Sequence, residues 1–226
     1  LRQYRATNLV VRSEDLEVSL RDGRVFVSET DEGPPAAVLL PGSGASFRFR
    51  PTPQTEREQV KLYAGSDTIA DIYDTMFMRL NPGEFAARIP AESLRQEAVD
   101  AGALRRAESV FRNEINKSFS LDMGDLSRES WSLAPNVGDL LVEIRSRQFP
   151  SLTYSKSSND AEDITVFDRR RRRNIAVYPS RSNMERNGRF FDEDRGVPYD
   201  VTDYLVEATF DPARQVIQGR TRLRLN

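Results

Sequence analysis

The sequence predicts a mainly β fold, an antiparallel sandwich or barrel-like module with one long helix and one short helix, followed by a β-hairpin. Short apolar runs recur through the first 50 residues at the spacing of antiparallel strands. One long segment carries apolar residues three and four positions apart, as in an amphipathic helix. The last 28 residues alternate apolar and polar side chains on both sides of a turn. We expect the module at residues 1–180, a linker at 181–198 and the hairpin at 199–226.

The first 50 residues predict five short strands. These apolar or alternating runs cover residues 8–12, 16–20, 25–28, 36–40 and 47–50. Asp22-Gly23 predicts a hairpin turn, because glycine adopts positive φ at low cost. Pro41-Gly42-Ser43-Gly44 predicts a second turn. Gly42 and Gly44 lack the third glycine and the following helix of a dinucleotide-binding loop, so we favour a tight turn over a phosphate site.

Two segments predict helices. Thr55 and Glu58 have the spacing of a capping box, which begins a short helix that Gly65 ends. Residues 91–119 predict the long helix. Its apolar stripe consists of Leu94, Ala98, Ala101, Leu104, Ala107, Phe111 and Ile115. The stripe indicates packing against the sheet, and a helix that binds a partner protein is the alternative.

Later strands are predicted on either side of a basic run. They cover residues 75–80, 84–89, 140–145, 152–154, 164–167 and 175–178. The basic run, which lies between the last two, is Arg169, Arg170, Arg171, Arg172 and Arg173. A formal net charge of −2 argues against a nucleic-acid-binding surface. We therefore expect an exposed hairpin tip, whose functional alternative is contact with an acidic face of another domain.

The terminal hairpin has one apolar face. Its strands cover residues 202–210 and 216–225, joined by an Asp-Pro turn. The apolar face consists of Tyr204, Val206, Phe210, Ile217, Leu223 and Leu225. Two strands alone are marginally stable in water. We therefore expect this face to pair with further strands, either in downstream domains of the same polypeptide or in a homodimer.

The same hairpin carries a resemblance. Tyr-Asp-Val-Thr, Phe-Asp-Pro and Ile-x-Gly within residues 199–225 resemble the opening of the aminopeptidase N-like (gluzincin) zinc metallopeptidases. Residues 162–195 resemble the lead-in of large bacterial members of that family, and residues 8–63 resemble their extra N-terminal β-module. The resemblance implies that the hairpin begins a second β-sandwich domain and that zinc binds in a catalytic domain further downstream. It also favours an extracytoplasmic location, periplasmic or secreted.

The chain itself lacks the residues that a zinc metallopeptidase uses for catalysis. With no His and no Cys, it contains no Ser-His-Asp triad, no Cys-His pair, no disulfide and no His-Glu-x-x-His zinc motif. We therefore expect no catalytic residue, metal or cofactor here, and a non-catalytic accessory module that serves domain packing or substrate access. The alternative is a free-standing carbohydrate- or protein-binding β-module with no peptidase attached. An enzyme that uses only carboxylates is a third class.

Two further candidate sites are weighed against simpler interpretations. Asp192-Glu193-Asp194 has the carboxylates for Ca²⁺ without the alternate spacing of a calcium loop, so a solvated linker is favoured. Trp131, Tyr154 and Tyr178 could form a platform that stacks on sugars, but core positions are favoured. No apolar run approaches the length of a membrane helix. The chain begins at Leu1 without Met, so we expect a native N-terminus, with any signal peptide, to have been removed, and location is not predicted from this end.

Overall fold

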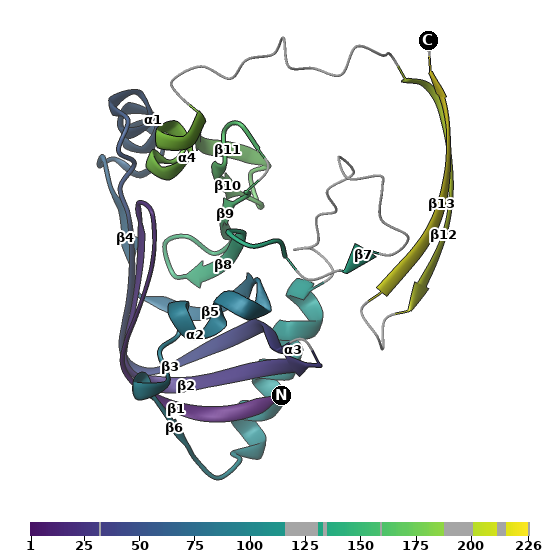
Figure 1. The fold of residues 1–226 in the computed structure, drawn as a ribbon. Helices are drawn as coiled ribbons and strands as arrows, with labels where there is room; N and C mark the ends of the chain where they lie inside the picture. Colours follow the sequence, from purple (N-terminus) through teal and green to yellow (C-terminus); the bar gives the residue numbers. More distant parts are fainter. Residues whose placement is uncertain are drawn as a thin grey trace.

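The computed structural model describes residues 1–31, 33–115, 131–132, 135–158, 160–187, 201–211 and 216–225. Two antiparallel sheets dominate these residues, and helices are few, so the prediction of a mainly β fold is confirmed. The larger sheet has ten strands in the order β11-β10-β9-β8-β5-β3-β2-β1-β6, with β4 paired to β3. The smaller sheet has the order β12-β13-β7. Figure 1 shows both.

The strands of the larger sheet are β1 (Arg2–Ser13), β2 (Leu16–Thr30), β3 (Gly33–Phe49), β4 (Ile69–Asp71), β5 (Tyr73–Leu80), β6 (Leu94–Gln96), β8 (Leu140–Ser146), β9 (Leu152–Lys156), β10 (Ile164–Asp168) and β11 (Arg173–Tyr178). Those of the smaller sheet are β7 (Trp131–Ser132), β12 (Val201–Asp211) and β13 (Val216–Leu225). The helices are α1 (Gln54–Ala64), α2 (Phe85–Arg88), α3 (Ala101–Ile115) and α4 (Arg181–Asn187), with 3₁₀ turns at Pro82–Glu84 and Ala91–Ser93.

The N-terminal part forms three long strands where the sequence predicts five short ones. Asp22-Gly23 and residues 41–44 lie inside β2 and β3, so the two turns predicted there are wrong. Asp22 pairs with Ser43 whereas Gly23 pairs with Pro41, which leaves Gly42 as the extra residue of a bulge. A Cβ on Gly23 would lie 2.7 Å from the carbonyl oxygen of Leu40, because the two strands approach closely there. These residues let long strands bend.

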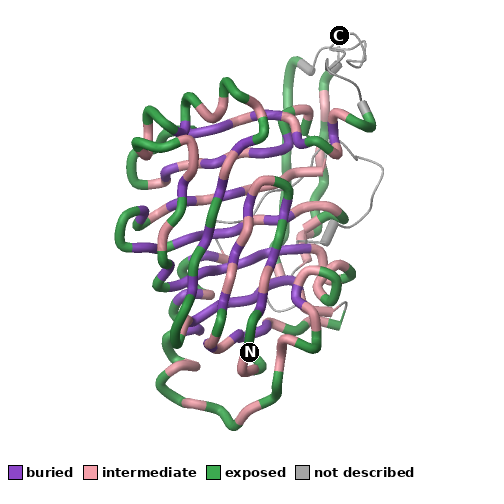
Figure 2. The backbone as a smooth tube through the Cα atoms, turned by 90° about the vertical axis from the view of Figure 1, so that its left-hand side faces the viewer, coloured by how far each residue is buried: buried purple, intermediate pink, exposed green. Residues whose placement is uncertain are grey.

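The bend folds one face of the sheet over itself. In Figure 1, β1–β3 run across the bottom of the molecule and turn upward. Figure 2 shows the resulting two layers of crossing strands, with buried residues alternating along them. The main core therefore contains side chains from both ends of the sheet, such as Leu9 and Val18 with Ile164 and Ile175. This arrangement fits the predicted sandwich-like module.

Two buried tyrosines join the ends of the folded sheet. The hydroxyl of Tyr154 on β9 donates to the backbone oxygen of Ser13 at 3.0 Å. The hydroxyl of Tyr178 on β11 donates to Oδ2 of Asp15, in the β1–β2 turn, at 2.7 Å. Burial, and then the hydrogen bond to Asp15, raise the pKa of Tyr178 well above its usual range. Both hydroxyls thus keep hydrogen-bond partners inside the protein.

A second core lies on the outer face of the sheet, under α3. Residues 36–40 are buried on both faces, as predicted: Ala37 and Leu39 join the main core, whereas Val38 faces the second core. Ala107 and Val110 of α3 cover this face, and Phe111 makes an edge-to-face contact with Phe77 at 5.9 Å between ring centroids. The predicted packing of the helical stripe on the sheet is confirmed for Ala107 and Phe111, whereas Leu94 and Ala98 of the predicted stripe lie before the helix.

Several predicted helix and strand boundaries are wrong. The long helix begins at Ala101, not Ala91, because the carboxylate of Asp100 accepts the backbone N–H groups of Gly102 and Ala103 and caps it. Residues 116–119 of the predicted helix lie outside the described part of the chain. Residues 84–89, predicted as a strand, form the end of a 3₁₀ turn and α2.

Helix α1 is short, as predicted, but begins differently. Its N-cap residue is Pro53, with no side-chain hydrogen bond at the cap, so the predicted capping box is wrong. Gly65 ends the helix at φ 78°, as predicted. The backbone N–H of Val177 on β11 donates to the Glu56 carboxylate at 3.1 Å, which places α1 against this edge strand.

The segment predicted as a linker begins with a helix. Residues Arg181–Asn187 form α4, capped by the Ser180 hydroxyl, which accepts the backbone N–H of Asn183 at 3.0 Å. The side-chain amide of Asn183 is buried and donates to the carbonyl oxygen of Ala161 at 2.9 Å. This part of the segment is therefore packed on the module. No described helix is long and apolar enough to cross a membrane.

Candidate binding site

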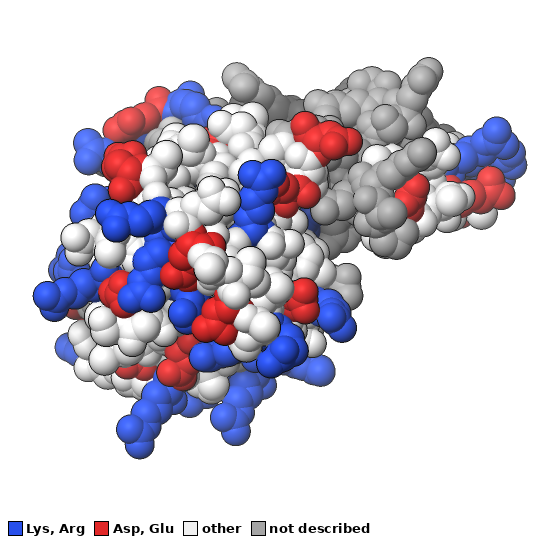
Figure 3. Space-filling view, turned by 90° about the horizontal axis from the view of Figure 1, so that it is seen from below, with Lys and Arg blue, Asp and Glu red and all other residues white. Residues whose placement is uncertain are grey.

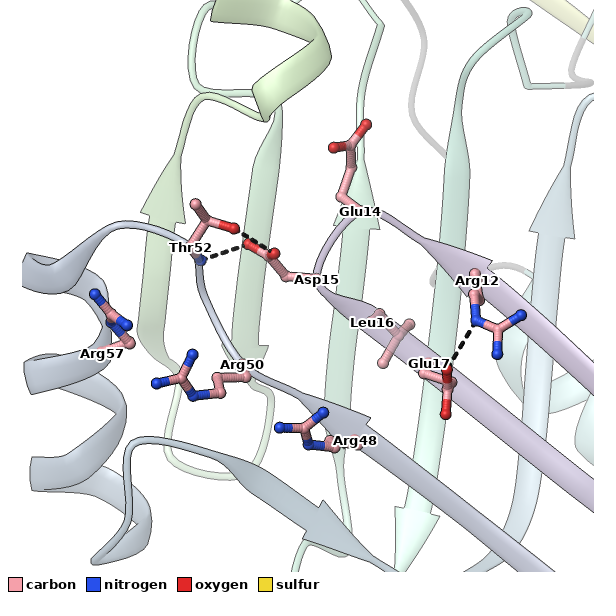
Figure 4. Close-up of a pocket in the computed structure, with 9 residues that line it drawn as sticks. All are labelled: Arg12, Glu14, Asp15, Leu16, Glu17, Arg48, Arg50, Thr52 and Arg57. Carbon is pink, nitrogen blue, oxygen red and sulfur yellow. Dashed lines mark hydrogen bonds and ion pairs between the residues drawn. The ribbon is translucent and has the colours of Figure 1, made fainter.

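One hollow on the surface of this chain is lined by arginines. It has a volume of about 400 Å³ and lies where the β1–β2 turn, the end of β3 and α1 meet. Its charged lining consists of Arg12, Glu14, Asp15, Glu17, Arg48, Arg50 and Arg57, beside Leu16 and Thr52. Figure 4 shows these nine residues. We call this site the arginine hollow.

Strand alternation places the arginines outside the core. Phe47 and Phe49 of β3 point into the main core and are 2% and 1% exposed, so Arg48 between them points outward. Arg50 follows directly after β3, and Arg57 belongs to the first turns of α1. In Figure 4 the guanidinium groups of Arg57, Arg50 and Arg48 follow one another along one side of the hollow. Arg48, Arg50 and Arg57 therefore form one row of basic side chains.

The three carboxylates of the hollow are already engaged. Asp15 accepts the backbone N–H and the hydroxyl of Thr52, at 2.7 and 2.6 Å. Glu17 lies 2.8 Å from Nε of Arg12. Glu14 lies 2.5 Å from Nζ of Lys156. Burial pushes the pKa of Glu14 upward, but the hydrogen bonds and charge of Lys156 outweigh it and hold that pKa below the usual value.

Two of the arginines have no ion-pair partner among the described residues. Arg50 is held by Asp67, with Nε and Nη2 at 3.1 and 2.9 Å from one carboxylate oxygen. Hydrogen bonds from Thr68 and from Arg50 lower the pKa of Asp67, and the charge of Arg57 adds to this. Arg48 and Arg57 form no ion pair within the described ranges. The row therefore contains two guanidinium groups without an ion pair among the described residues, one on each side of Arg50.

The predicted arginine run divides between the surface and the interior. Arg169 turns inward, with its guanidinium 2.6 Å from Glu114 of α3 and 2.8 Å from Glu143 of β8. Arg170, Arg171, Arg172 and Arg173 are exposed at the tip of the β10–β11 hairpin, as predicted. Arg171 lies over the ring of Tyr63, 5.2 Å from its centroid. The proposed contact with an acidic face of another domain is therefore limited to the four exposed residues Arg170, Arg171, Arg172 and Arg173.

The inward arginine belongs to a buried charged cluster. Glu114 and Glu143 are 1% and 4% exposed, and Arg145 also pairs with Glu114. Thr153 donates its hydroxyl to the carboxylate of Glu143, at 2.9 and 2.8 Å from its two oxygens. Burial raises the pKa of Glu143, although Arg169 and Thr153 oppose this. The cluster ties α3 to the sheet and faces no described cavity.

The apolar face of the terminal hairpin meets solvent. Tyr204 pairs with Leu223 and Phe210 with Ile217 across the two strands, so these side chains share one face. Tyr204 and Phe210 are 62% and 56% exposed, and Val206 is also exposed. Ile217 and Leu223 are half-buried, and Leu225 pairs with Val201 through its backbone. β13 also pairs with β7 at Val216 and Ile217.

The sugar-stacking platform is wrong, because Tyr154 and Tyr178 are buried at 1% and 4% exposure and cannot meet a sugar ring. The side chain of Trp131 and all of Asp192-Glu193-Asp194 lie outside the described residues. Within the described ranges no cluster of three or more acidic side chains is arranged to hold a metal ion. On the face that Figure 3 shows, basic and acidic side chains are interspersed, so that face presents no continuous basic surface.

The fold and the sites define this chain as a mainly β antiparallel module with helix α3 on its outer face and an arginine-lined hollow. A scan against protein-family models finds no match, and neither a search of curated proteins nor a search of solved structures finds one.

Sequence reasoning missed the arginine hollow. Its members come from segments far apart in the chain, and only folding brings Arg12, Arg48 and Arg57 together. The available signal was local: Arg48 and Arg50 alternate with Phe47 and Phe49, which predicts that both arginines leave the core on the same face.

Proposed function

We propose that this chain is a non-catalytic accessory module of a protein similar to the aminopeptidase N-like zinc metallopeptidases, and that it acts by docking its terminal hairpin on further β-strands. The observation that supports docking is the exposed apolar face of β12 and β13. Burying apolar surface contributes about 25 cal/mol per Å². Side chains as large as Tyr204 and Phe210 therefore gain several kcal/mol together when a partner sheet covers them.

The open edges of the hairpin support the same docking. β12 pairs only with β13 among the described strands, and β13 pairs with β7 only at Val216 and Ile217. Unpaired backbone N–H and C=O groups along such edges are templates for another strand. In the proposed parent protein, downstream strands occupy the apolar face and the open edges. In the isolated chain we expect a second copy to do so, because a symmetric contact covers both faces at once.

Mass measurement tests the docking. Light scattering of residues 1–226 is expected to give a dimer, and residues 1–198 a monomer. Phe210→Lys places a charge on the apolar face and is expected to give a monomer. Thr209→Lys, on the opposite face of the same strand, is the matched control and should remain dimeric. Equal masses for the two chain lengths would remove the hairpin as the contact.

The full open reading frame tests whether the parent protein is a metallopeptidase, and an activity assay tests the non-catalytic role of this chain. A His-Glu-x-x-His motif downstream of the hairpin supports the metallopeptidase parent, whereas its absence supports the alternative, a free-standing carbohydrate- or protein-binding module. We expect residues 1–226 to show no zinc-dependent peptidase activity, because they contain no His and no Cys. Hydrolysis of aminoacyl-anilides by this chain, abolished by a chelator, would overturn the non-catalytic role.

A further inference from the structure

We infer that the arginine hollow binds a small polar ligand that carries two oxyanion groups, such as phosphates, sulfates or carboxylates. This inference is independent of the hairpin and of the proposed function. It rests on three observations: the volume of the hollow, the absence of an ion pair at Arg48 and Arg57 among the described residues, and the hydrogen bond or ion pair that each carboxylate of the lining already makes.

The size of the hollow fits a small molecule. Ligand sites in proteins span a few hundred to about 1,000 Å³, and this one has about 400 Å³. A single inorganic phosphate would leave much of that space to water. Leu16 is the one apolar side chain of the lining and is buried, so the surface offered to a ligand is polar. A compact polar anion fits this space better than an aromatic or aliphatic ligand.

The free guanidinium groups indicate two anionic groups on the ligand. Guanidinium presents N–H donors in a planar fork that matches carboxylate, sulfate and phosphate oxygens. Arg50 donates to Asp67 and stands between Arg48 and Arg57. Arg48 and Arg50, two positions apart on one strand face, have Cα atoms roughly 7 Å apart. An anion at each free arginine, one on either side of Arg50, therefore suits a ligand with two separated charges.

Each acidic residue of the hollow has a hydrogen-bond or ion-pair partner in the protein. Asp15 accepts three hydrogen bonds from Thr52 and Tyr178, which fix its position, and it keeps its negative charge because all three donors are neutral. Glu14 is directed to Lys156 and Ser182. Only Glu17 pairs with an arginine of the lining, Arg12. Arg48 and Arg57, which form no ion pair among the described residues, are therefore the arginines of the lining that are open to an anion.

Calorimetric titration of residues 1–226 tests the inference. The probes are pyrophosphate, citrate and inorganic phosphate, each at the same ionic strength set with chloride. Pyrophosphate or citrate is expected to bind at least about tenfold more tightly than inorganic phosphate. Binding of pyrophosphate alone assigns phosphate-type ligands, and binding of citrate alone assigns carboxylates. If neither binds more tightly than inorganic phosphate, the inference is overturned.

Matched variants locate the binding. Arg48→Gln and Arg57→Gln should each weaken binding of the preferred probe by about tenfold, as expected when a charged hydrogen-bond donor is removed. Arg170→Gln, which removes an exposed arginine outside the hollow, should leave affinity unchanged. Asp67→Asn releases Arg50 and should strengthen binding. Circular dichroism verifies that each variant is folded. Equal affinities for the Arg48, Arg57 and Arg170 variants would contradict the site.

Discussion

Nη2 of Arg169 lies 2.6 Å from Oε2 of Glu114, although 55 residues separate them in the chain. Glu114 is in α3, on the outer face of the sheet, and Arg169 begins the loop between β10 and β11. The same guanidinium reaches Glu143 of β8 at 2.8 Å. One side chain therefore connects the helix, the centre of the sheet and a hairpin near its edge, in a place where both carboxylates are almost fully buried.

Removing this arginine should destabilise the fold. Arg169→Gln leaves Glu143 without its ion pair and removes one of those of Glu114. Losing one partner of a buried ion pair costs about 3–5 kcal/mol, because the remaining charge stays desolvated. We expect a drop of this size in the free energy of unfolding, measured by urea denaturation. Arg170→Gln, at the next and exposed position, should change it by less than about 0.5 kcal/mol. Equal losses in the two variants would show that the cluster does not stabilise the fold.

The titration of Glu143 gives a pH-dependent prediction. Burial raises its pKa above the value of about 4.3 in an unfolded chain. Between the unfolded pKa and the folded pKa, the folded state therefore binds more protons at Glu143 than the unfolded state does. The contribution of Glu143 to stability is thus greatest below the unfolded pKa. It falls as pH rises through the folded pKa. Replacing Glu143 with Gln should remove this dependence from the unfolding free energy.

Thr153 offers a direct check on the same group. Its hydroxyl hydrogen bond favours the ionised form of Glu143. Thr153→Val should therefore raise the pKa of Glu143 further, as followed by NMR titration of the side-chain carboxyl carbon. Thr165→Val serves as the control, because Thr165 lies on the neighbouring strand β10 and has no hydrogen bond to this carboxylate among the described residues. An unchanged midpoint in the Thr153 variant would contradict the assigned contact.

The bend of the long strands depends on Gly23. A Cβ at this position would lie 2.7 Å from the Leu40 carbonyl oxygen and 2.8 Å from Cδ1 of Leu20. Gly23→Ala should therefore lower the free energy of unfolding by about 1–3 kcal/mol, the usual cost of overpacking. Gly219→Ala is the control within a strand, since its nearest neighbour to the added Cβ is 3.8 Å away. Equal melting temperatures for Gly23→Ala and the natural chain would show that the bend tolerates a side chain.

The second core should not accept a charge. Val38 is 0% exposed and faces α3, so Val38→Asp buries a carboxylate without a partner. We expect a loss of several kcal/mol in unfolding free energy. Val99→Asp, at a position 64% exposed, is the control and should be nearly neutral. Thermal unfolding, followed by circular dichroism, distinguishes the two variants. Coincident unfolding curves would show that Val38 is not part of the core.

The sequence alone determined the positions and faces of many strands. Residues 140–145 and 164–167 are predicted as strands and form β8 and β10. Leu140, Val142 and Ile144 are buried on one side of β8, but Glu143 on the other side is buried as well. Gly65 marks the end of α1, and the apolar run 36–40 marks a strand buried on both faces. These features depend on local dihedral preferences and on side-chain direction, both of which are encoded within a few consecutive residues.

Only the tertiary structure decided which other segments of the chain those strands and helices contact. Asp22-Gly23 has the composition of a turn, yet pairing with β3 on one side and β1 on the other keeps it inside a bent strand. Five consecutive arginines look alike in sequence, yet buried Glu114 and Glu143 draw in the first and leave the others in solvent. The arginine hollow exists because β1, β3 and α1 converge. Such outcomes depend on contacts between distant segments, whose free energy no local window of sequence contains.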